Sequence, residues 1–208
     1  MKTLVALMIV GVMLTGCGGK MEEAAQAMKN LETMAESAED AQKNQDVVSK
    51  RREERRAKGD TIAMSTDELK AYLPGDISGY KAGEPETSST EMEGFSFAQA
   101  TRSYKRDDGA TVKVDLTDYN SSEAGYAGMA MLFAMKWRVD NAQETSGTFQ
   151  TGDPFINGHE RYDKTSKNST LVYGLGGRFI LNIEAEKQDI AFARSVAEKI
   201  DLKKLASK

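Results

Sequence analysis

Residues 21–58 contain no glycine, no proline and no aromatic residue, and this property decides where a folded core can form. The segment consists largely of Ala, Glu, Lys, Gln, Arg and Met, which are good helix formers. Its apolar positions recur at spacings of three and four, but half of them are alanines that bury little surface. These positions are Met21, Ala24, Met28, Leu31, Ala35 and Ala38. We therefore predict a largely exposed helix with at most weak self-association, and a core built from later residues.

Charge is distributed unevenly along this predicted helix. Acidic side chains dominate its first half, and the basic run 50–58 (KRREERRAK) ends it. Cations near a helix C-terminus are favoured by the helix macrodipole. We therefore predict that the run is a solvated helix end, with a site for anionic lipid, cell wall or a partner as the alternative. Gly59 is the residue type at which helices commonly stop.

The N-terminus carries one positive charge, Lys2, followed by the uninterrupted apolar run Leu4–Leu14. A helix of that length spans about 16 Å, roughly half of the hydrocarbon core of a bilayer. The run is therefore too short to be a comfortable membrane span. It has the length of the apolar region of a signal peptide.

The single cysteine of the chain follows that run in the sequence LTGC, from Leu14 to Cys17. This stretch resembles the lipobox of bacterial lipoproteins with a type II signal peptide, in which Leu, a small polar residue and Gly precede the cysteine. The resemblance implies cleavage between Gly16 and Cys17, with S-diacylglycerol and N-acyl groups, palmitate among them, on Cys17. Two or three acyl chains hold a protein on a membrane far more firmly than one.

The residue after the cysteine bears on which membrane receives the protein. In Gram-negative lipoproteins an Asp at that position is the familiar signal for inner-membrane retention. Here the position is Gly18. The resemblance therefore implies an outer-membrane lipoprotein facing the periplasm, whereas a Gram-positive source would leave no such choice.

The composition excludes several classes of function. One cysteine cannot form a disulfide within the chain, and one histidine cannot form a multi-histidine metal site. A formal net charge of -4 provides no general basic face for nucleic acid. We predict no metal, no cofactor and no nucleic-acid partner. The expected partners are a membrane, through the lipid anchor, and an envelope protein or lipid.

The chain is predicted to consist of a cleaved signal peptide (1–16), a lipidated cysteine with a helical stalk (17–59), and one α+β domain (60–208). Hairpins without a βαβ alternation favour an antiparallel sheet, packed here by a long central helix and a C-terminal helix. This order of elements loosely resembles the α/β/α sandwich of the Mog1/PsbP-like group. That resemblance carries no motif and transfers no functional residue.

Strands are predicted from alternation and from aromatic and β-branched content. The segments 94–106 and 111–119 should pair as a hairpin, because Val112, Val114 and Leu116 share one face. Residues 81–90 are predicted to be a loop, and Asn168-Ser169 and the GLGG of 174–177 to be turns. Further strands are expected in TSGTFQTG, PFINGHERYDKT, STLVYGL and GRFILNIEAE.

Helices are predicted at three places in the domain. Ser65 and Glu68 have the spacing of a capping box that opens a short helix. Residues 121–142 should form the central helix, and 189–205 a C-terminal helix. A stripe on the central helix is expected to pack on the sheet, with an adaptable binding surface or a lipid cavity beside Met131 and Met135 as alternatives. The stripe consists of Ala124, Gly128, Met131, Met135 and Val139.

No catalytic motif stands out. His159 and Arg161 should face one side of a strand and Glu160 the other, so we expect a surface or hydrogen-bonding histidine. Asp115 and Asp118 should lie on opposite faces. These two aspartates, together with Glu123, are predicted to be solvated turn or strand residues.

Two functions from different classes follow. The first is a non-catalytic, membrane-anchored envelope lipoprotein whose domain binds a protein, lipid or cell-wall partner. The alternative is an envelope enzyme, hydrolase-like, that uses scattered carboxylates or His159. The enzyme requires a pocket that gathers at least two titratable groups.

Overall fold

A computed structural model describes part of the 208-residue chain, and its contacts divide the chain into 1–36 and 37–208. Every described residue lies in the second unit, so the predicted signal peptide, the lipobox and most of the stalk lie outside the described residues. Side chains of 123, 124, 130–132 and 134 are also outside the description. The described residues are 42, 46–92, 95–120, 122–134 and 136–208.

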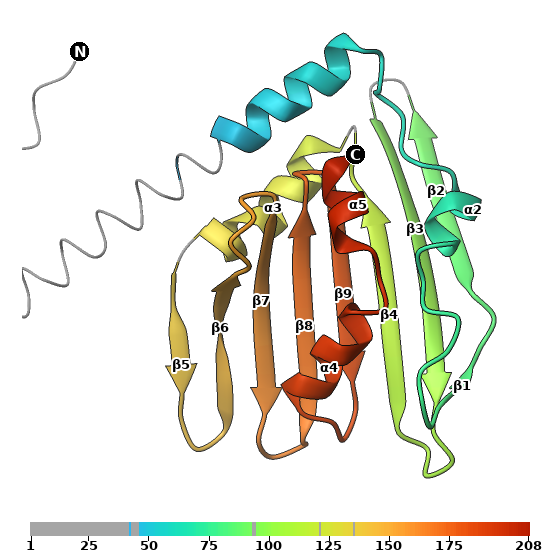
Figure 1. The fold of residues 1–208 in the computed structure, drawn as a ribbon, viewed down its shortest axis with the longest axis vertical. Coiled ribbons are helices and arrows are strands. Elements are labelled where there is room, and N and C mark those ends of the chain that lie inside the picture. Colours follow the sequence, from blue (N-terminus) through green and yellow to red (C-terminus); the bar gives the residue numbers. More distant parts are fainter. Residues whose placement is uncertain (1–41, 43–45, 93–94, 121, 135) are drawn as a thin grey trace, which may run out of the picture. The chain divides into compact units, whose positions relative to one another are not determined.

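A nine-stranded sheet forms the centre of the fold (Figure 1). Its strands follow the order β1-β3-β4-β9-β8-β7-β6-β5, and β2 also pairs with β3. All of the pairings are antiparallel. The strands are β1 (Lys81–Ala82), β2 (Glu86–Met92), β3 (Phe95–Lys105), β4 (Thr111–Asp118), β5 (Arg138–Asp140), β6 (Glu144–Gln150), β7 (Ile156–Asp163), β8 (Asn168–Leu175) and β9 (Phe179–Ala185).

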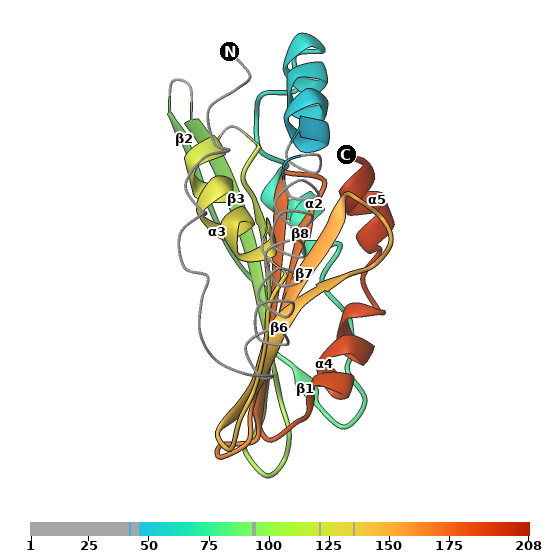
Figure 2. The ribbon, with the colours of Figure 1, turned by 90° about the vertical axis from the view of Figure 1, so that its left-hand side faces the viewer.

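Helices cover both faces of this sheet. The short helices α2 (Thr66–Lys70), α4 (Ile190–Ala197) and α5 (Leu202–Ser207) lie on one face, and α3 (Glu123–Ala134) lies on the other (Figure 2). After β4 the chain crosses the second face as α3 and resumes pairing at the far edge with β5. Four further strands then return toward the centre, so that β9 pairs with β4.

The core has two parts, one on each face. The larger part joins the sheet to α2, α4 and α5, and it contains the fully buried side chains of Leu69, Leu181 and Leu205. The smaller part lies under α3, where Tyr126 and Phe133 pack on the sheet. Because strand side chains alternate between faces, a sheet with helices on both sides needs apolar residues at successive positions of its central strands. Strands β8 and β9 satisfy this requirement, with every residue from 171 to 181 buried.

Several sequence predictions are confirmed. The chain is α+β with an antiparallel sheet, and 94–106 and 111–119 form the paired strands β3 and β4. Val112, Val114 and Leu116 are all 0% exposed, as their alternation predicted. Ser65 accepts a hydrogen bond from the backbone N–H of Glu68, whose side chain accepts one from Ser65 N–H, completing the capping box.

The predicted central helix is much shorter than expected. We expected residues 121–142, but α3 ends at Ala134, and Arg138–Asp140 form strand β5 against β6. The Oδ1 of Asn141 accepts hydrogen bonds from the backbone N–H of Gln143 and Glu144, which closes a hairpin turn. The local turn offered by an Asn side chain competes with helix, and β-branched Val139 favours a strand.

The predicted C-terminal helix of 189–205 is two helices rather than one. Helix α4 ends at Ala197, and α5 begins at Leu202 after a break. The side chain of Asp201 accepts from the backbone N–H of Lys204 at 2.9 Å and so caps α5. An aspartate that caps a helix lies outside it, which ends the 3.6-residue pattern at this point.

Two further predictions of irregular structure were wrong. Residues 81–90 contain β1 and most of β2, and both strands pair with the same edge of β3. Asn168 and Ser169 open β8, and the turn before them has its left-handed residue at Lys167, with φ 57°. Asn168 Oδ1 accepts from Lys187 N–H at 3.1 Å, so its polar side chain satisfies a neighbouring hairpin instead of forming its own turn.

Candidate functional site

The turn between β8 and β9 is a tight Gly-Gly hairpin at the end of the sheet. Gly176 and Gly177 both adopt left-handed conformations, with φ 63° and 69°. Side chains are excluded as well, because a Cβ on Gly176 would lie 2.7 Å from the carbonyl oxygen of Ala206, and one on Gly177 would overlap Val48. The turn was predicted from its glycines, and its close packing explains why it has no side chains.

A helical segment, residues 46–57, docks on this turn. It ends in a Schellman motif at Gly59 (φ 78°), with Gly59 N–H bonded to Arg56 O and Asp60 N–H to Arg55 O. Its position is fixed by Arg52, whose Nη2 donates to Gly177 O at 3.3 Å, and by Arg55, whose Nη1 donates to Gly176 O at 3.1 Å.

A third arginine joins the segment to the C-terminus. Arg51 Nη2 donates to the carbonyl oxygen of Ser207 at 2.9 Å, and its guanidinium lies 4.2 Å from the ring centroid of Phe155. The sequence predicted a solvated helix end here. That prediction was wrong for Arg52 and Arg55, which are 9% and 6% exposed, because the spacing of 51, 52 and 55 places three side chains on one side of a helix.

A buried ion pair lies beside the docked segment. Arg178 directly follows the Gly-Gly turn, and its Nε and Nη2 donate to the carboxylate of Asp118 at 2.9 and 2.7 Å. Asp118 is 0% exposed and also accepts from the backbone N–H of Met64 and Asn120. The prediction of a solvated Asp118 was therefore wrong. Because a buried carboxylate needs partners for its lone pairs, four donors converge on it.

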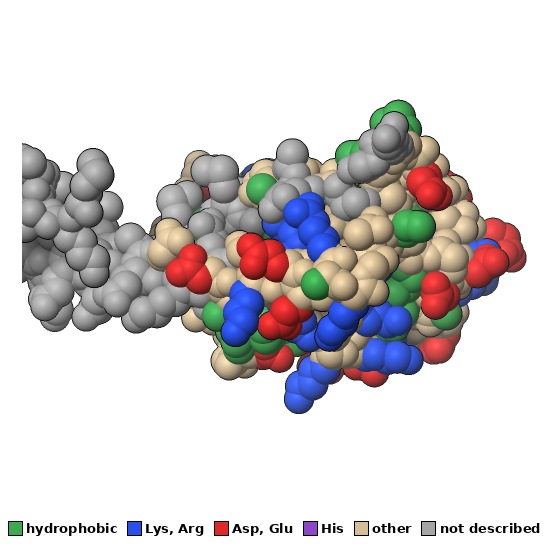
Figure 3. Space-filling model, turned by 90° about the horizontal axis from the view of Figure 1, so that it is seen from above, with side chains coloured by type: hydrophobic (Ala, Val, Ile, Leu, Met, Phe, Trp, Pro, Cys, Tyr) green, Lys and Arg blue, Asp and Glu red, His purple; other side chains and the backbone are tan. Residues whose placement is uncertain are grey.

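Asp60 extends this network toward the surface. Arg178 Nη1 donates to Asp60 Oδ2 at 2.9 Å, and Asn120 Nδ2 donates to Asp60 Oδ1 at 2.7 Å. A polar groove of about 370 Å³ opens here, with Arg178, Asp60, Ser65 and Lys208 among its lining residues. We call Arg52, Arg55, Arg178, Asp60 and Asp118 the arginine junction. Figure 3 looks down on this end of the domain, where blue basic and red acidic side chains lie side by side.

The electrostatics of the junction are unusual at two groups. Burial, with the neighbouring positive charge of Arg178 as a further cause, lowers the pKa of Arg55 to about 10. Burial raises the pKa of Tyr126 to about 12, although Arg52 and Arg55 oppose that rise. A guanidinium whose charged form is disfavoured lacks a close counter-charge.

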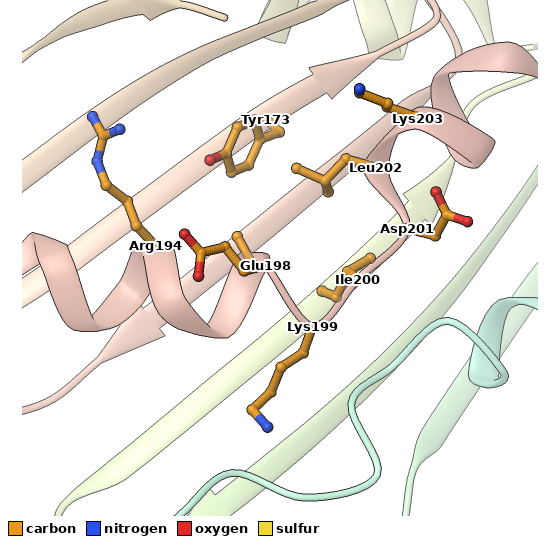
Figure 4. Close-up of a pocket in the computed structure, with 9 residues that line it drawn as sticks. Tyr173, Arg194, Glu198, Lys199, Ile200, Asp201, Leu202 and Lys203 are labelled. Carbon is orange, nitrogen blue, oxygen red and sulfur yellow. The ribbon is translucent and has the colours of Figure 1, made fainter.

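A second hollow lies between α4 and α5 on the larger core face (Figure 4). Its volume is about 590 Å³, and Tyr173, Ile200 and Leu202 provide apolar surface inside it. Arg194 at its margin is paired with Glu160 and lies over the ring of Phe149. The charged side chains around it come from α4, from α5 and from the break between them, which the sequence prediction of one continuous helix did not anticipate.

The opposite face of the sheet carries a polar row beyond α3. Asp115 accepts hydrogen bonds from Gln99 Nε2 and Thr101 Oγ1, each at 2.6 Å, and from Thr117 Oγ1 at 3.1 Å. Asp115 and Asp118 lie on opposite faces, as predicted. The row runs across six strands in the register Thr101, Asp115, Asn182, Val172, His159 and Thr148.

His159 is a hydrogen-bonding histidine on that row. Its Nε2 lies 3.2 Å from Ser146 Oγ, and its ring centroid lies 5.2 Å from that of Trp137. Burial lowers its pKa below the ordinary 6.5. Glu160 points to the other face, as the alternation predicted, and there it meets Arg194. The structure therefore does not bring the two neighbouring titratable residues together.

The remaining predicted site residues lie outside what can be described. Gly16 and Cys17 are in the undescribed N-terminus, and the side chains of Glu123, Met131 and Met135 are undescribed. Among described residues, no group of three or more His, Cys, Asp or Glu side chains is placed to hold a metal ion. Within the same part of the chain, no helix combines the length and apolarity needed to cross a bilayer.

Comparison with known proteins adds no relative: no family model, curated protein or solved structure matches this chain. The arginine junction was missed in the sequence, although two signals were present. Arg178 is the only charge between Leu171 and Ile183, within a run that is otherwise apolar or small apart from Asn182. The basic run also places three arginines at helical spacing, which favours docking as much as solvation.

Proposed function

We propose that this chain is a lipid-anchored envelope lipoprotein whose α+β domain binds a protein, lipid or cell-wall partner without catalysis. The observation that carries the proposal is the agreement of Lys2, the apolar run Leu4–Leu14 and the LTGC ending at Cys17 with a lipoprotein signal. Residues 1–16 would be removed, and Cys17 would carry S-diacylglycerol and an N-acyl group. Gly18 supports an outer-membrane location facing the periplasm.

The docked segment 46–57 supports a tethering role. A tether that ends in a free joint would let the domain tumble, whereas this segment is hydrogen-bonded to the β8–β9 turn and to Ser207 through three arginines. The end of the sheet that bears this turn is therefore held toward the tether. The lower loops of the sheet point away from it (Figure 1), which suits a domain that meets a partner at a distance from its anchor.

The alternative of an envelope hydrolase has one contact in its favour, that of Ser146 Oγ with His159 Nε2. A nucleophile must reach its substrate, and Ser146 is only 4% exposed. The carboxylates that the alternative needs, Asp115 and Asp118, lie on opposite faces of the sheet. The geometry therefore favours binding over hydrolysis.

A labelling experiment tests the anchor. Cells that express the full precursor are fed an alkyne-tagged fatty acid, and the purified protein is compared with the Cys17→Ser variant. We expect label on wild type only, and wild type alone in the membrane fraction. Equal labelling of both chains would overturn the proposal. In a Gram-negative host, Gly18→Asp should move the labelled protein from the outer to the inner membrane.

The binding role needs its own test. Native-level purification of the lipidated protein after crosslinking in its own envelope should recover the same partner in repeated experiments. The undocking variant Gly177→Ala serves as the comparison for tether geometry. Turnover by the soluble domain in a hydrolase screen, lost in His159→Gln, would instead support the enzyme.

A further inference from the structure

Arg55 is a buried cation with half of its donors unused. The side chain is 6% exposed, and only Nη1 has a hydrogen-bond partner, Gly176 O. Nε and Nη2 are fully buried and have no hydrogen-bond partner among the described residues. A buried charged donor left without a partner is strongly destabilising. Evolution rarely keeps such a group unless something else satisfies it.

The two unused nitrogens form one fork. Nε–H and one Nη2–H of a guanidinium point in parallel from the same edge, which matches the spacing of two oxygens of a carboxylate or phosphate. Arg178 uses this same Nε and Nη2 edge to hold Asp118. Arg55 therefore presents, a short distance along the junction, the kind of edge that already holds an oxyanion in its neighbour.

The nearby carboxylates do not serve Arg55. Asp118 is engaged by Arg178 and by two backbone N–H groups. Asp60 accepts from Arg178 and from Asn120. Asp60 attracts the charge of Arg55, but the repulsion from Arg178 is the larger of the two effects. The local field at Arg55 therefore remains favourable to an additional anion.

We propose that the arginine junction binds a phosphate-bearing ligand through the Nε and Nη2 edge of Arg55, between the segment 46–57 and the β8–β9 turn. Two adjacent buried guanidinium groups favour a doubly charged phosphate monoester over a singly charged carboxylate. Arg178 connects the site to solvent, because its side chain also lines the polar groove beside Asp60 and Lys208. The ligand chemistry is shared by free phosphate and by the headgroup of an anionic lipid.

Binding at this place is coupled to docking of the helical segment. Arg55 belongs to the segment, whereas Gly176 belongs to the sheet, so an anion on Arg55 compensates the charge that docking buries. A ligand that binds the docked state more tightly than the undocked state shifts the equilibrium toward docking. Phosphate should therefore protect residues 46–57 from proteolysis and raise the thermal midpoint of the protein.

The first test uses the mature chain with Cys17→Ser, so that no acyl group contributes. Inorganic phosphate is titrated while the thermal midpoint and the cleavage of 46–57 by trypsin are followed. We expect a saturable rise in wild type and at least a tenfold loss of phosphate affinity in Arg55→Met. Arg56→Met removes the same charge from an exposed neighbour and should retain the affinity of wild type. Equal losses in both variants would show general charge attraction and overturn the proposal.

A second pair of variants removes the dependence on one mutant. In phosphate-free buffer Arg55→Met should unfold at a higher temperature than wild type, because it no longer buries an unpaired charge. Arg55→Lys keeps the charge but lacks the fork, and it should also lose at least tenfold in phosphate affinity. If Arg55→Met is less stable than wild type without phosphate, or Arg55→Lys binds as well as wild type, the site is not the one proposed.

The source of the phosphate group is separated by vesicles. The same Cys17→Ser protein is mixed with phosphatidylcholine vesicles that contain or lack phosphatidic acid. Arg55-dependent protection of 46–57 by phosphatidic acid alone assigns a lipid headgroup, and protection by inorganic phosphate assigns a free ligand. Protection by neither overturns the site. Because all of these samples lack the lipid anchor, their outcome is independent of fatty-acid labelling at Cys17.

Discussion

Arg178 and Asp118, sixty positions apart in the chain, meet side-on inside the protein, with Nε and Nη2 at 2.9 and 2.7 Å from the carboxylate. Asp118 ends β4, and Arg178 precedes β9, which is the neighbour of β4. The pair therefore closes the junction of the two halves of the sheet at its end. Removal of one partner leaves the other charge buried and uncompensated.

We predict that Asp118→Ala lowers the free energy of unfolding by about 3–5 kcal/mol, the usual cost of breaking a buried pair. Asp115→Ala is the matched control on the same strand, since Asp115 is half-buried and bonded to neutral side chains. It should cost about 1 kcal/mol. Urea unfolding of both variants measures the difference. Equal costs would mean that the buried pair contributes no more than an ordinary polar contact.

Gly177→Ala should undock the helical segment. The substitution costs about 1–2 kcal/mol from the left-handed backbone alone, and its Cβ would also overlap Val48. Gly109→Ala is the control, because Gly109 has φ 85° but open space around its Cβ. Hydrogen exchange of 46–57 should rise in Gly177→Ala and not in Gly109→Ala.

The clash itself can be isolated in a double-mutant cycle. Val48→Ala in the Gly177→Ala background should recover the part of the loss that exceeds the Gly109→Ala value. If the two glycine variants lose equal stability, Val48 does not pack on the turn in solution.

His159 should make the protein less stable in mild acid. Burial lowers its pKa, with the charges of Glu160, Arg161 and Glu144 as smaller causes of either sign. The unfolded chain then binds more protons than the folded chain below pH 6.5. The contribution of neutral His159 is therefore complete above 6.5 and is lost as the pH falls through the lowered pKa.

Since the chain has one histidine, its ring protons give a single NMR titration from which the pKa is read directly. A midpoint at or above 6.5 would contradict the prediction. His159→Gln should flatten the dependence of urea stability on pH between 5 and 7, because it removes the only group that titrates there with an ordinary pKa.

Tyr104→Phe should cost about 1 kcal/mol, at the lower end of the range for a lost buried hydrogen bond. The Tyr104 hydroxyl donates to Pro74 O at 2.5 Å, but Arg102 Nη1 also donates to that oxygen at 3.2 Å, so the carbonyl keeps a partner. Unfolding in urea at neutral pH measures this cost.

Alkaline pH gives Tyr104 a second signature. Burial raises its pKa to about 12, so its stabilising contribution is complete below pH 10 and is lost as the pH rises through 12. The difference in stability between wild type and Tyr104→Phe should therefore shrink over that interval. A difference that stays constant from pH 9 to 12 would show that the hydroxyl is not buried.

The sequence was informative where one local rule acted alone. The alternation of Val112, Val114 and Leu116 predicted β4 and its buried face, and the spacing of Ser65 and Glu68 predicted the cap of α2. In both cases the structure is decided within a few neighbouring residues. Such patterns survive folding because tertiary contacts reinforce them.

The failures share a physical cause, which is competition between local and long-range interactions. Arg138–Asp140 continued a helical pattern, but pairing with β6 and the Asn141 turn made them a strand. Asp118 looked like a strand-ending turn residue because its partner, Arg178, is remote in sequence. The docking of Arg52 and Arg55 likewise depends on carbonyl oxygens more than a hundred positions away.

The hydrogen bond from Arg51 to Ser207 O has a mechanical consequence. It ties the point where the chain enters the domain to the point where it leaves, and the neighbouring arginines attach the same segment to the β8–β9 turn. A pull along the helical segment thus loads strands that have neighbours on both sides. Edge strands β2 and β5 are spared, so tension would shear the sheet at its middle rather than peel it from a margin.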